Sequence, residues 1–136
     1  MTTKDRYTGI QSVFATAHDE ACLFLCILSI AEEYTGKEID FIYAYRTALK
    51  NELIDKTFSC LDQEKLLAML TSRKWHKTVV KTLPGTVPVN MYTVEKWYND
   101  RTKFIHFKRR GFDTLYNSVT VKEGSILEYY CYTVEG

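Results

Sequence analysis

The sequence predicts an α+β fold in which helices form the N-terminal half and a mostly antiparallel sheet forms the C-terminal half. Apolar residues recur at helical spacing as far as Arg73, and they gather into short strand-like runs after Lys74. Helices first and strands second is the order typical of α+β domains. Aromatic residues make up 14% of the chain and include ten Tyr, which favours a sheet. Because 136 residues match the size of one domain, we expect a single domain over residues 1–136.

The first predicted helix spans about residues 19–34 and carries the longest apolar run of the chain. Asp19 is a good N-cap, and nearly every position from Ala21 to Ala31 is apolar. A helix that is apolar all round is normally buried. We therefore expect this helix to be the most buried one and to pack against the sheet.

Two further helices are predicted at about residues 39–53 and 62–73. Each segment has apolar residues spaced three and four apart, with charged residues between them. Ser59 or Asp62 would supply the N-cap of the third helix.

The second half of the chain is predicted to form the sheet, after a break marked by Pro84 and Pro88. Residues 94–99 favour a helical turn, and Lys122-Glu123-Gly124 predicts a tight turn before the last strand. The expected strand segments are residues 75–82, 87–92, 104–109, 119–121 and 125–134.

Charge and hydropathy exclude two classes of partner. Lys and Arg number 18 and Asp and Glu number 17, for a net charge of +1, whereas nucleic-acid binding usually requires a strongly basic surface. The apolar run at residues 21–31 is shorter than the ~20 residues that a membrane span needs. We therefore expect neither nucleic acid nor a membrane as a partner.

The cysteines Cys22, Cys26, Cys60 and Cys131 show no C-x-x-C spacing of the kind found in zinc sites and redox motifs. Three scattered histidines do not complete a metal site, so we expect no metal and no other cofactor. The charged start of the chain, residues 1–7, has no apolar core after it, which argues against a secretory signal. The expected location is a reducing cytoplasm, with all four cysteines as thiols.

Cys22 is the candidate nucleophile because it falls in the first turn of the first predicted helix. The unpaired N–H groups and partial positive charge of a helix N-terminus favour a thiolate. A thiolate beside a base is a competent nucleophile. The alternative is that Cys22 is a small apolar core residue, which is what we expect of Cys26 one turn later.

Three histidines are candidate general bases. His18 directly precedes the first helix, and His76 lies at the edge of a predicted strand. His106 lies inside the apolar segment Phe104-Ile105-His106-Phe107, where a buried imidazole needs hydrogen-bond partners. A structural histidine with satisfied hydrogen bonds is the alternative.

Asp113 and Asn117 are the candidates to orient the base. They follow His106 in a connection that could return either side chain to the neighbouring strand. Asp and Asn are also ordinary turn residues, so a purely local role is the alternative for both.

The order Cys22, His106 and then Asp113 or Asn117 resembles that of the papain-like cysteine peptidases. The resemblance is strongest to the small bacteriocin-processing and cell-wall-peptide hydrolases, in which a G-C or P-C pair opens the helix and an H-F or H-x-V strand carries the base. It implies a papain-like fold with Cys22 as nucleophile, His106 as general base and Asp113 as the orienting residue. The matching segments are Glu20-Ala21-Cys22-Leu23-Phe24-Leu25-Cys26 and Thr102-Lys103-Phe104-Ile105-His106-Phe107.

Over residues 20–134 the chain also resembles, more narrowly, a small family of unknown function from spirochaetes and their phage-like plasmids. That family runs from a G-C-Y-F-like helix to a D-x-x-x-N-S-x-T-V-x-x-G ending with an aromatic strand. The corresponding pieces here are Cys22-Leu23-Phe24, Trp97-Tyr98-Asn99, Thr102 to Phe107, and Asp113 to Gly124.

The resemblance also implies an oxyanion hole. Papain-like enzymes combine the backbone N–H of the Cys with a Gln side chain roughly six residues upstream. Ala21 stands here where those enzymes have Gly or Pro, and Gln11 lies eleven residues before Cys22. Gln11 is the second donor that the resemblance implies, at a spacing that departs from the family.

Two functions from different classes follow. The first is a cysteine hydrolase of peptidase or amidase type, acting on an amide or thioester of a peptide or protein. The second is a catalytically weak or inactive scaffold that binds a protein, as a phage-type effector or inhibitor would. Tyr129, Tyr130 and Tyr132 could supply such an interface, because Tyr is enriched in interface cores. Strand alternation puts Tyr130 and Tyr132 on one face and Tyr129 and Cys131 on the other.

A basic stretch surrounds the predicted strand that carries His106. We expect a solvated strand end, whose charges also protect an edge strand from pairing with another chain. Contact with an acidic partner or substrate is the alternative. The residues are Arg101, Lys103, Lys108, Arg109 and Arg110.

Overall fold

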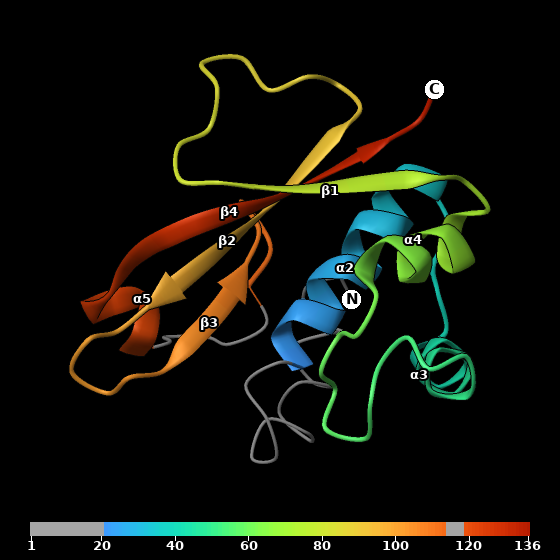
Figure 1. Ribbon diagram of the computed structural model, residues 1–136, viewed down its shortest axis with the longest axis horizontal. Helices are drawn as coiled ribbons and strands as arrows, with labels where there is room; N and C mark the ends of the chain where they lie inside the picture. The colour runs from blue at the N-terminus through green and yellow to red at the C-terminus, as the bar shows by residue number, and fades with distance from the viewer. Residues whose placement is uncertain (1–20, 114–118) are drawn as a thin grey trace.

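The computed structural model describes residues 21–113 and 119–136, and this part of the chain has the predicted α+β architecture. Its helices are α2 (Ala21–Thr35), α3 (Phe41–Lys50), α4 (Gln63–Thr71) and α5 (Val119–Glu123), and its strands are β1 (Trp75–Val80), β2 (Met91–Tyr98), β3 (Ile105–Lys108) and β4 (Ser125–Val134). The strands form one antiparallel sheet in the order β1-β4-β2-β3, so β1 and β3 are its edges. Helices α2, α3 and α4 lie to one side of the sheet, and the short α5 lies at the end of β2 (Figure 1).

The predicted helices of the first half are confirmed, with α3 and α4 shorter than expected. Asp40 caps α3 by accepting hydrogen bonds from the backbone N–H groups of Ile42 and Tyr43. Asp62, not Ser59, caps α4, because its carboxylate accepts from the N–H of Lys65. The chain then leaves α4 through Ser72, whose φ of 59° is left-handed and ends the helix.

Three predictions for the second half differ from the structure. Residues 94–99 do not form a helical turn, because residues 94–98 complete β2, which pairs with β4 on one side and with β3 on the other. Pairing on both sides outweighs the local preference of this segment. Residues 119–121 are not a strand but part of the short helix α5. The strand expected at residues 87–92 begins only at Met91.

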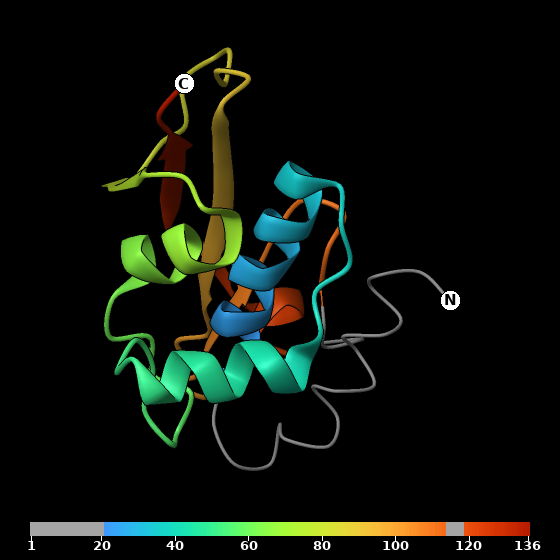
Figure 2. The same ribbon diagram turned by 90° about the vertical axis from the view of Figure 1, so that its right-hand side faces the viewer.

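Helix α2 is buried on all sides, as its unbroken apolar run predicts. Phe24 contacts Phe41 of α3 and Phe58 of the loop before α4, with ring centroids 5.8 Å apart in both pairs. On the other side the core continues through Phe107 of β3 and Tyr132 of β4. Figure 2 shows α2 lying between the sheet and α3. The helix is thereby fixed against both halves of the fold.

The turn between β2 and β3 is organised by Asn99, which is 1% exposed. Its Oδ1 accepts hydrogen bonds from the backbone N–H groups of Arg101 at 2.9 Å and Thr102 at 3.2 Å. Its own N–H donates to the carbonyl of Phe104. This accounts for the Trp97-Tyr98-Asn99 piece of the sequence: the asparagine closes the hairpin that leads into the strand of His106.

Gly124 lies where α5 and β4 meet the end of β2. A Cβ atom there would be 2.1 Å from the carbonyl oxygen of Thr120 and 2.3 Å from that of Tyr98. Only glycine fits so close an approach of two backbones. The glycine that ends the Asp113 to Gly124 piece is therefore a requirement of packing.

Helices that cross a bilayer are long and apolar. None of those in residues 21–113 and 119–136 combines the length and the apolar character that crossing a bilayer requires.

Candidate functional site

Cys22 is the second residue of α2 and lies in its first turn, where backbone N–H groups have no partner within the helix. The amide N–H of Phe107, on the edge strand β3, donates to the Cys22 Sγ at 3.4 Å. The residue is 1% exposed. The start of α2 thus lies against the open edge of the sheet, and the thiol bridges the two.

The imidazole of His106 is the polar partner of this thiol. Its side chain is 3% exposed, and its Nε2 lies 2.7 Å from Oδ1 of Asp113. Burial lowers the pKa of His106, but hydrogen bonds to Asp113 and Cys22 outweigh burial and raise the pKa to about 9. Because Nε2 faces the carboxylate, Nδ1 is the ring nitrogen that remains for the thiol.

A tight hairpin after β3 brings Asp113 back to His106. Arg109 and Phe112 exchange two backbone hydrogen bonds, of 2.8 and 2.9 Å, around a turn in which Gly111 has a φ of +78°. By strand alternation His106 leaves one face of β3, and Phe107 and Arg109 leave the other. Asp113 follows the hairpin directly, and its side chain reaches the face of His106.

The other candidates from the sequence fall elsewhere. His76 is on β1 and pairs with Glu135 at 2.6 Å, and both of these side chains are about half exposed. Cys26 is buried in the core as predicted, and burial raises the pKa of its thiol well above its ordinary value. The structure brings Asp113 to the imidazole. Four predicted residues lie outside the described residues, namely Gln11, His18, Asp19 and Asn117.

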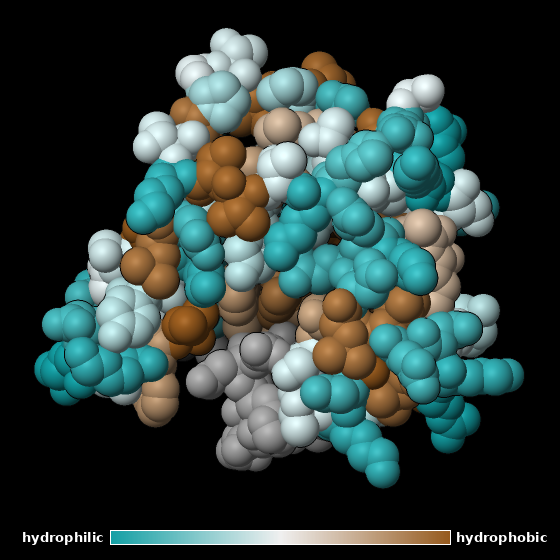
Figure 3. Space-filling model, in the orientation of Figure 1, coloured by the Kyte–Doolittle hydropathy of each residue, from teal (hydrophilic) through white to brown (hydrophobic). Residues whose placement is uncertain are grey.

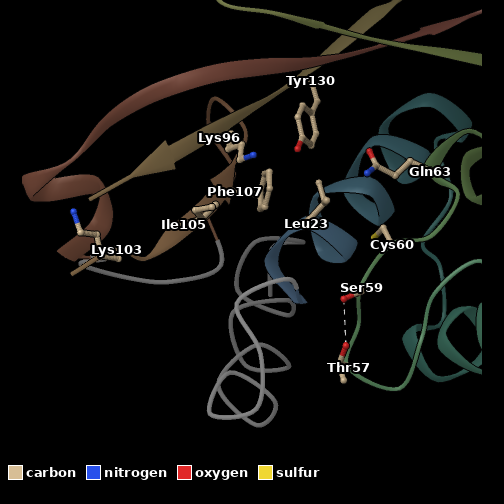
Figure 4. A pocket seen from close by; sticks show the side chains of 10 residues that line it. All are labelled: Leu23, Thr57, Ser59, Cys60, Gln63, Lys96, Lys103, Ile105, Phe107 and Tyr130. Carbon is tan, nitrogen blue, oxygen red and sulfur yellow. Dashed lines mark hydrogen bonds between the residues drawn. The ribbon is translucent and has the colours of Figure 1, made fainter. Parts of the chain in front are cut away.

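A pocket of about 380 Å³ opens on the face of β3 that carries Ile105 and Phe107, and neither Cys22 nor His106 lines it. Leu23 and Phe107, the chain neighbours of Cys22 and His106, line it together with Tyr130, whose ring lies 5.4 Å from that of Phe107. Figure 4 shows these apolar side chains on one side and Thr57 and Ser59, joined by a hydrogen bond, on the other. The remaining lining residues are Cys60, Gln63, Lys96, Lys103 and Ile105.

Two tyrosines of β4, Tyr130 and Tyr132, lie on the same face of the sheet, as strand alternation predicts. Tyr132 is fully buried and donates from its hydroxyl to Gln63, and Tyr130 lines the pocket. The face that these two share is therefore the one covered by helices.

The basic stretch around β3 is only partly a solvated strand end. Arg110 is exposed, and Lys108 lies 3.9 Å from Glu95. Arg109, in contrast, turns inward, because its guanidinium donates to Ser29 of α2 at 2.9 Å and to Glu33. For Arg109 the expectation of a solvated side chain is wrong.

A metal centre needs several ligating side chains close together. Within residues 21–113 and 119–136, no three His, Cys, Asp or Glu side chains gather closely enough to hold an ion. All four cysteines lie in these ranges, and each is a thiol rather than half of a disulfide.

With this geometry in hand, we compared the chain with known proteins. No family model, no curated protein and no solved structure matches it. The arrangement of Cys22, His106 and Asp113 must therefore be judged on its own chemistry.

Sequence reasoning missed two contributors to the site. The first is the N–H of Phe107, a backbone group that no residue pattern marks. The second is Arg109, whose inward direction follows from its sharing a strand face with Phe107. The available signal was the position of Arg109 two residues after the apolar Phe107, and it was outweighed by the run of three basic residues.

Proposed function

We propose that this protein is a cysteine hydrolase of peptidase or amidase type on a papain-like scaffold, with Cys22 as nucleophile, His106 as general base and Asp113 as the orienting residue. The observation that carries the proposal is the position of the His106 ring, hydrogen-bonded to the Asp113 carboxylate through Nε2 and also to the Cys22 thiol. A nucleophile, a base and a group that orients the base are the parts that covalent hydrolysis requires.

Each group has a defined part in the reaction. His106 takes the proton of Cys22, and the thiolate attacks the acyl carbon of an amide or thioester. Collapse of the tetrahedral adduct breaks the bond to the leaving amine or thiol, which takes the proton from His106. Water, deprotonated by His106, then attacks the acyl-thioester and releases the acid and the thiol of Cys22.

The surroundings of the thiol support this chemistry. The Phe107 N–H and the first turn of α2 both stabilise negative charge on the sulfur. The backbone N–H of Cys22 is one donor for the oxyanion, and we propose Gln11 as the second. The pocket beside Leu23 and Phe107 offers a partly apolar surface for a peptide or protein substrate.

The experiment is alkylation with iodoacetamide at about pH 6 and about pH 8.5, followed by peptide mapping of all four cysteines. An ordinary thiol becomes roughly a hundred-fold more reactive over this range, whereas a thiolate paired with imidazolium changes little. We expect the Cys22 rate to be nearly constant and the Cys60 rate to rise steeply. This ratio is independent of how accessible each sulfur is.

Two histidine variants provide the matched comparison. His106→Ala should restore a steep pH dependence at Cys22, because the thiolate loses its partner. His76→Ala should leave the Cys22 rate unchanged, although it too removes a histidine paired with a carboxylate. A Cys22 rate that rises with pH as steeply as that of Cys60 in the unaltered protein would refute the hydrolase.

A second candidate function is a catalytically silent scaffold that binds a protein. The observation that favours it is the burial of Cys22, which at 1% exposed has the accessibility of a core cysteine. The exposed large apolar side chains argue against a single binding patch, because they are spread over several elements, including Tyr43 on α3 and Val79 on β1. Figure 3 shows apolar side chains interspersed with hydrophilic ones on the face in view.

The two functions differ in stoichiometry. A hydrolase acts at substoichiometric dose and loses its effect in Cys22→Ser, which keeps the size of the side chain but removes the thiolate. A binding protein saturates at equal amounts and keeps its effect in Cys22→Ser. A substoichiometric effect that survives Cys22→Ser would contradict the cysteine hydrolase directly.

A further inference from the structure

Arg109 directly follows an edge strand, yet its side chain is only 13% exposed. Its Nη1 donates to the Ser29 hydroxyl at 2.9 Å, and its Nη2 donates to the Glu33 carboxylate. The guanidinium lies 5.9 Å from the centre of the Tyr92 ring. These contacts tie the end of β3 to α2.

The contacts of Arg109 are the second of two links between these elements. The first joins the Phe107 N–H to the Cys22 Sγ. Along α2 the two links are seven residues apart, or ~10 Å, and along β3 they are two residues apart, or ~7 Å. Two separated links fix the direction of α2 relative to β3. With the link at the thiol alone, the helix could rotate about that point.

The backbone of Arg109 also sets the position of Asp113. It closes the hairpin with Phe112, and Asp113 is the next residue. One residue therefore connects the helix that carries the thiol, the strand that carries the imidazole and the hairpin that carries the carboxylate.

Stability alone does not explain a charged residue here. The Nε atom of Arg109 is buried and has no hydrogen-bond partner among the described residues. An incompletely satisfied buried cation is costly, and apolar replacements of buried ion pairs are often neutral or stabilising. What an apolar side chain could not supply is the directional, two-pronged attachment to Ser29 and Glu33.

We propose that Arg109 is a positioning residue, which aligns the Cys22 end of α2 with the hydrogen-bonded pair of His106 and Asp113. The proposal rests on the proposed function for its catalytic meaning, while the alignment itself can be measured in the resting protein.

The test is the titration of the His106 ring, followed by NMR of the histidine side chains in the full chain. The groups that face this ring are Cys22 from α2 and Asp113 from the hairpin, and the Glu95–Lys108 pair shares its face of β2 and β3. Hydrogen bonds to Cys22 and Asp113 hold the pKa of His106 at about 9. Misalignment would weaken them and lower the pKa.

The sign of the change separates alignment from simple charge. Removing a nearby positive charge raises the pKa of a histidine, whereas loss of its charge-assisted hydrogen bonds lowers it. We expect Arg109→Met to lower the His106 midpoint by about one pH unit or more, the size expected for one such bond. Arg109→Lys keeps the positive charge but cannot donate to Ser29 and Glu33 at the same time, as a guanidinium does. Its His106 midpoint should lie between those of Arg109→Met and the unaltered protein. Arg101→Met removes an exposed arginine paired with Glu123 and should leave the midpoint unchanged.

An unchanged or raised midpoint in a folded Arg109→Met protein would overturn the proposal. If Arg109→Met does not fold, the His106 midpoints of Arg109→Lys and Ser29→Ala provide the test. Unchanged midpoints in both variants would overturn the proposal. If the proposed hydrolase function is wrong, the experiments give a different result. In that case Cys22 of the unaltered protein alkylates like an ordinary thiol, while the effect of Arg109 on the His106 titration persists.

Discussion

The amide N–H of Phe107 donates to the sulfur of Cys22 across 85 positions of the chain, at 3.4 Å. This bond joins the helical half of the protein to the edge of the sheet at the point where the candidate nucleophile lies. It also occupies a backbone N–H of an edge strand that would otherwise be open to another chain. The thiol is thus part of the contact that unites the two halves.

The first prediction concerns the pH dependence of stability. The pKa of His106 is about 9 in the folded protein and close to 6.5 in the unfolded chain. Because the folded state binds the proton more tightly, this contribution is fully present below about pH 6.5 and is lost as the pH rises through about 9. We expect urea denaturation of Cys22→Ser, in which no thiol titrates beside the ring, to show a loss of up to roughly 3 kcal/mol across this window.

The control for this prediction is a comparison of two histidines. His106→Gln should flatten the alkaline loss of stability, whereas His76→Gln, at an exposed pair, should leave it in place. Both histidine variants are made in the Cys22→Ser background. If Cys22→Ser with and without His106→Gln loses stability in parallel between about pH 6.5 and about pH 9, the protonated imidazole does not contribute as described.

The second prediction concerns Gly124. A Cβ there would approach the carbonyl oxygens of Thr120 and Tyr98 to 2.1 and 2.3 Å, and neither backbone can move aside cheaply. Gly124→Ala should lower the free energy of unfolding by about 3 kcal/mol. Gly85→Ala is the matched control, because a Cβ at Gly85 meets nothing within 4 Å and should change stability by less than about 0.5 kcal/mol. Equal thermal midpoints for the two variants would show that α5 does not pack against β2 in this way.

The third prediction concerns Asn99, the residue that closes the β2–β3 turn. Asn99→Ala leaves the N–H groups of Arg101 and Thr102 without their acceptor, so the free energy of unfolding should fall by about 1–3 kcal/mol. Asn51→Ala removes a side-chain bond at an exposed helix end and should cost only a few tenths of a kcal/mol. Chemical denaturation of both variants measures the difference, and a loss at Asn51 that matches the loss at Asn99 would argue against the buried turn.

The fourth prediction concerns the two buried cysteines of α2. Burial raises the pKa of Cys26, so its thiol should resist alkylation until the protein unfolds. Cys26→Ser places a hydroxyl in the apolar core and should cost about 1–3 kcal/mol, measured by thermal unfolding. Cys60→Ser, at a half-buried position, should cost less. Fast labelling of Cys26 in the folded protein would mean that α2 is less enclosed than described.

Much of the fold follows from local pattern. The apolar run of α2 predicts its burial, and the N-cap residue Asp62 marks the start of α4. Residues 94–99 show the limit of such reasoning. Their local sequence favours a turn, but β4 and β3 pair with the segment on both sides, and no short window of sequence contains that information.

Some residues of the candidate site could likewise be predicted from the sequence, and others depend on the fold. Chain order and residue type suggested Cys22, His106 and Asp113, which the structure brings together. The return of Asp113 to the imidazole needed the hairpin at Gly111, whose left-handed backbone sets where the chain returns. The inward turn of Arg109 depended on where α2 lies, and that is decided by packing across the whole molecule.

The enclosure of α2 has a consequence for the order in which the protein is made. The ribosome releases this helix early, yet the residues that cover it, from α4 through β3 to Tyr132, follow over the next hundred positions. A nascent segment that is apolar all round cannot bury its surface until those partners have emerged. We therefore expect the emerging chain to depend on holding chaperones, and fragments that stop before β4 to aggregate rather than fold.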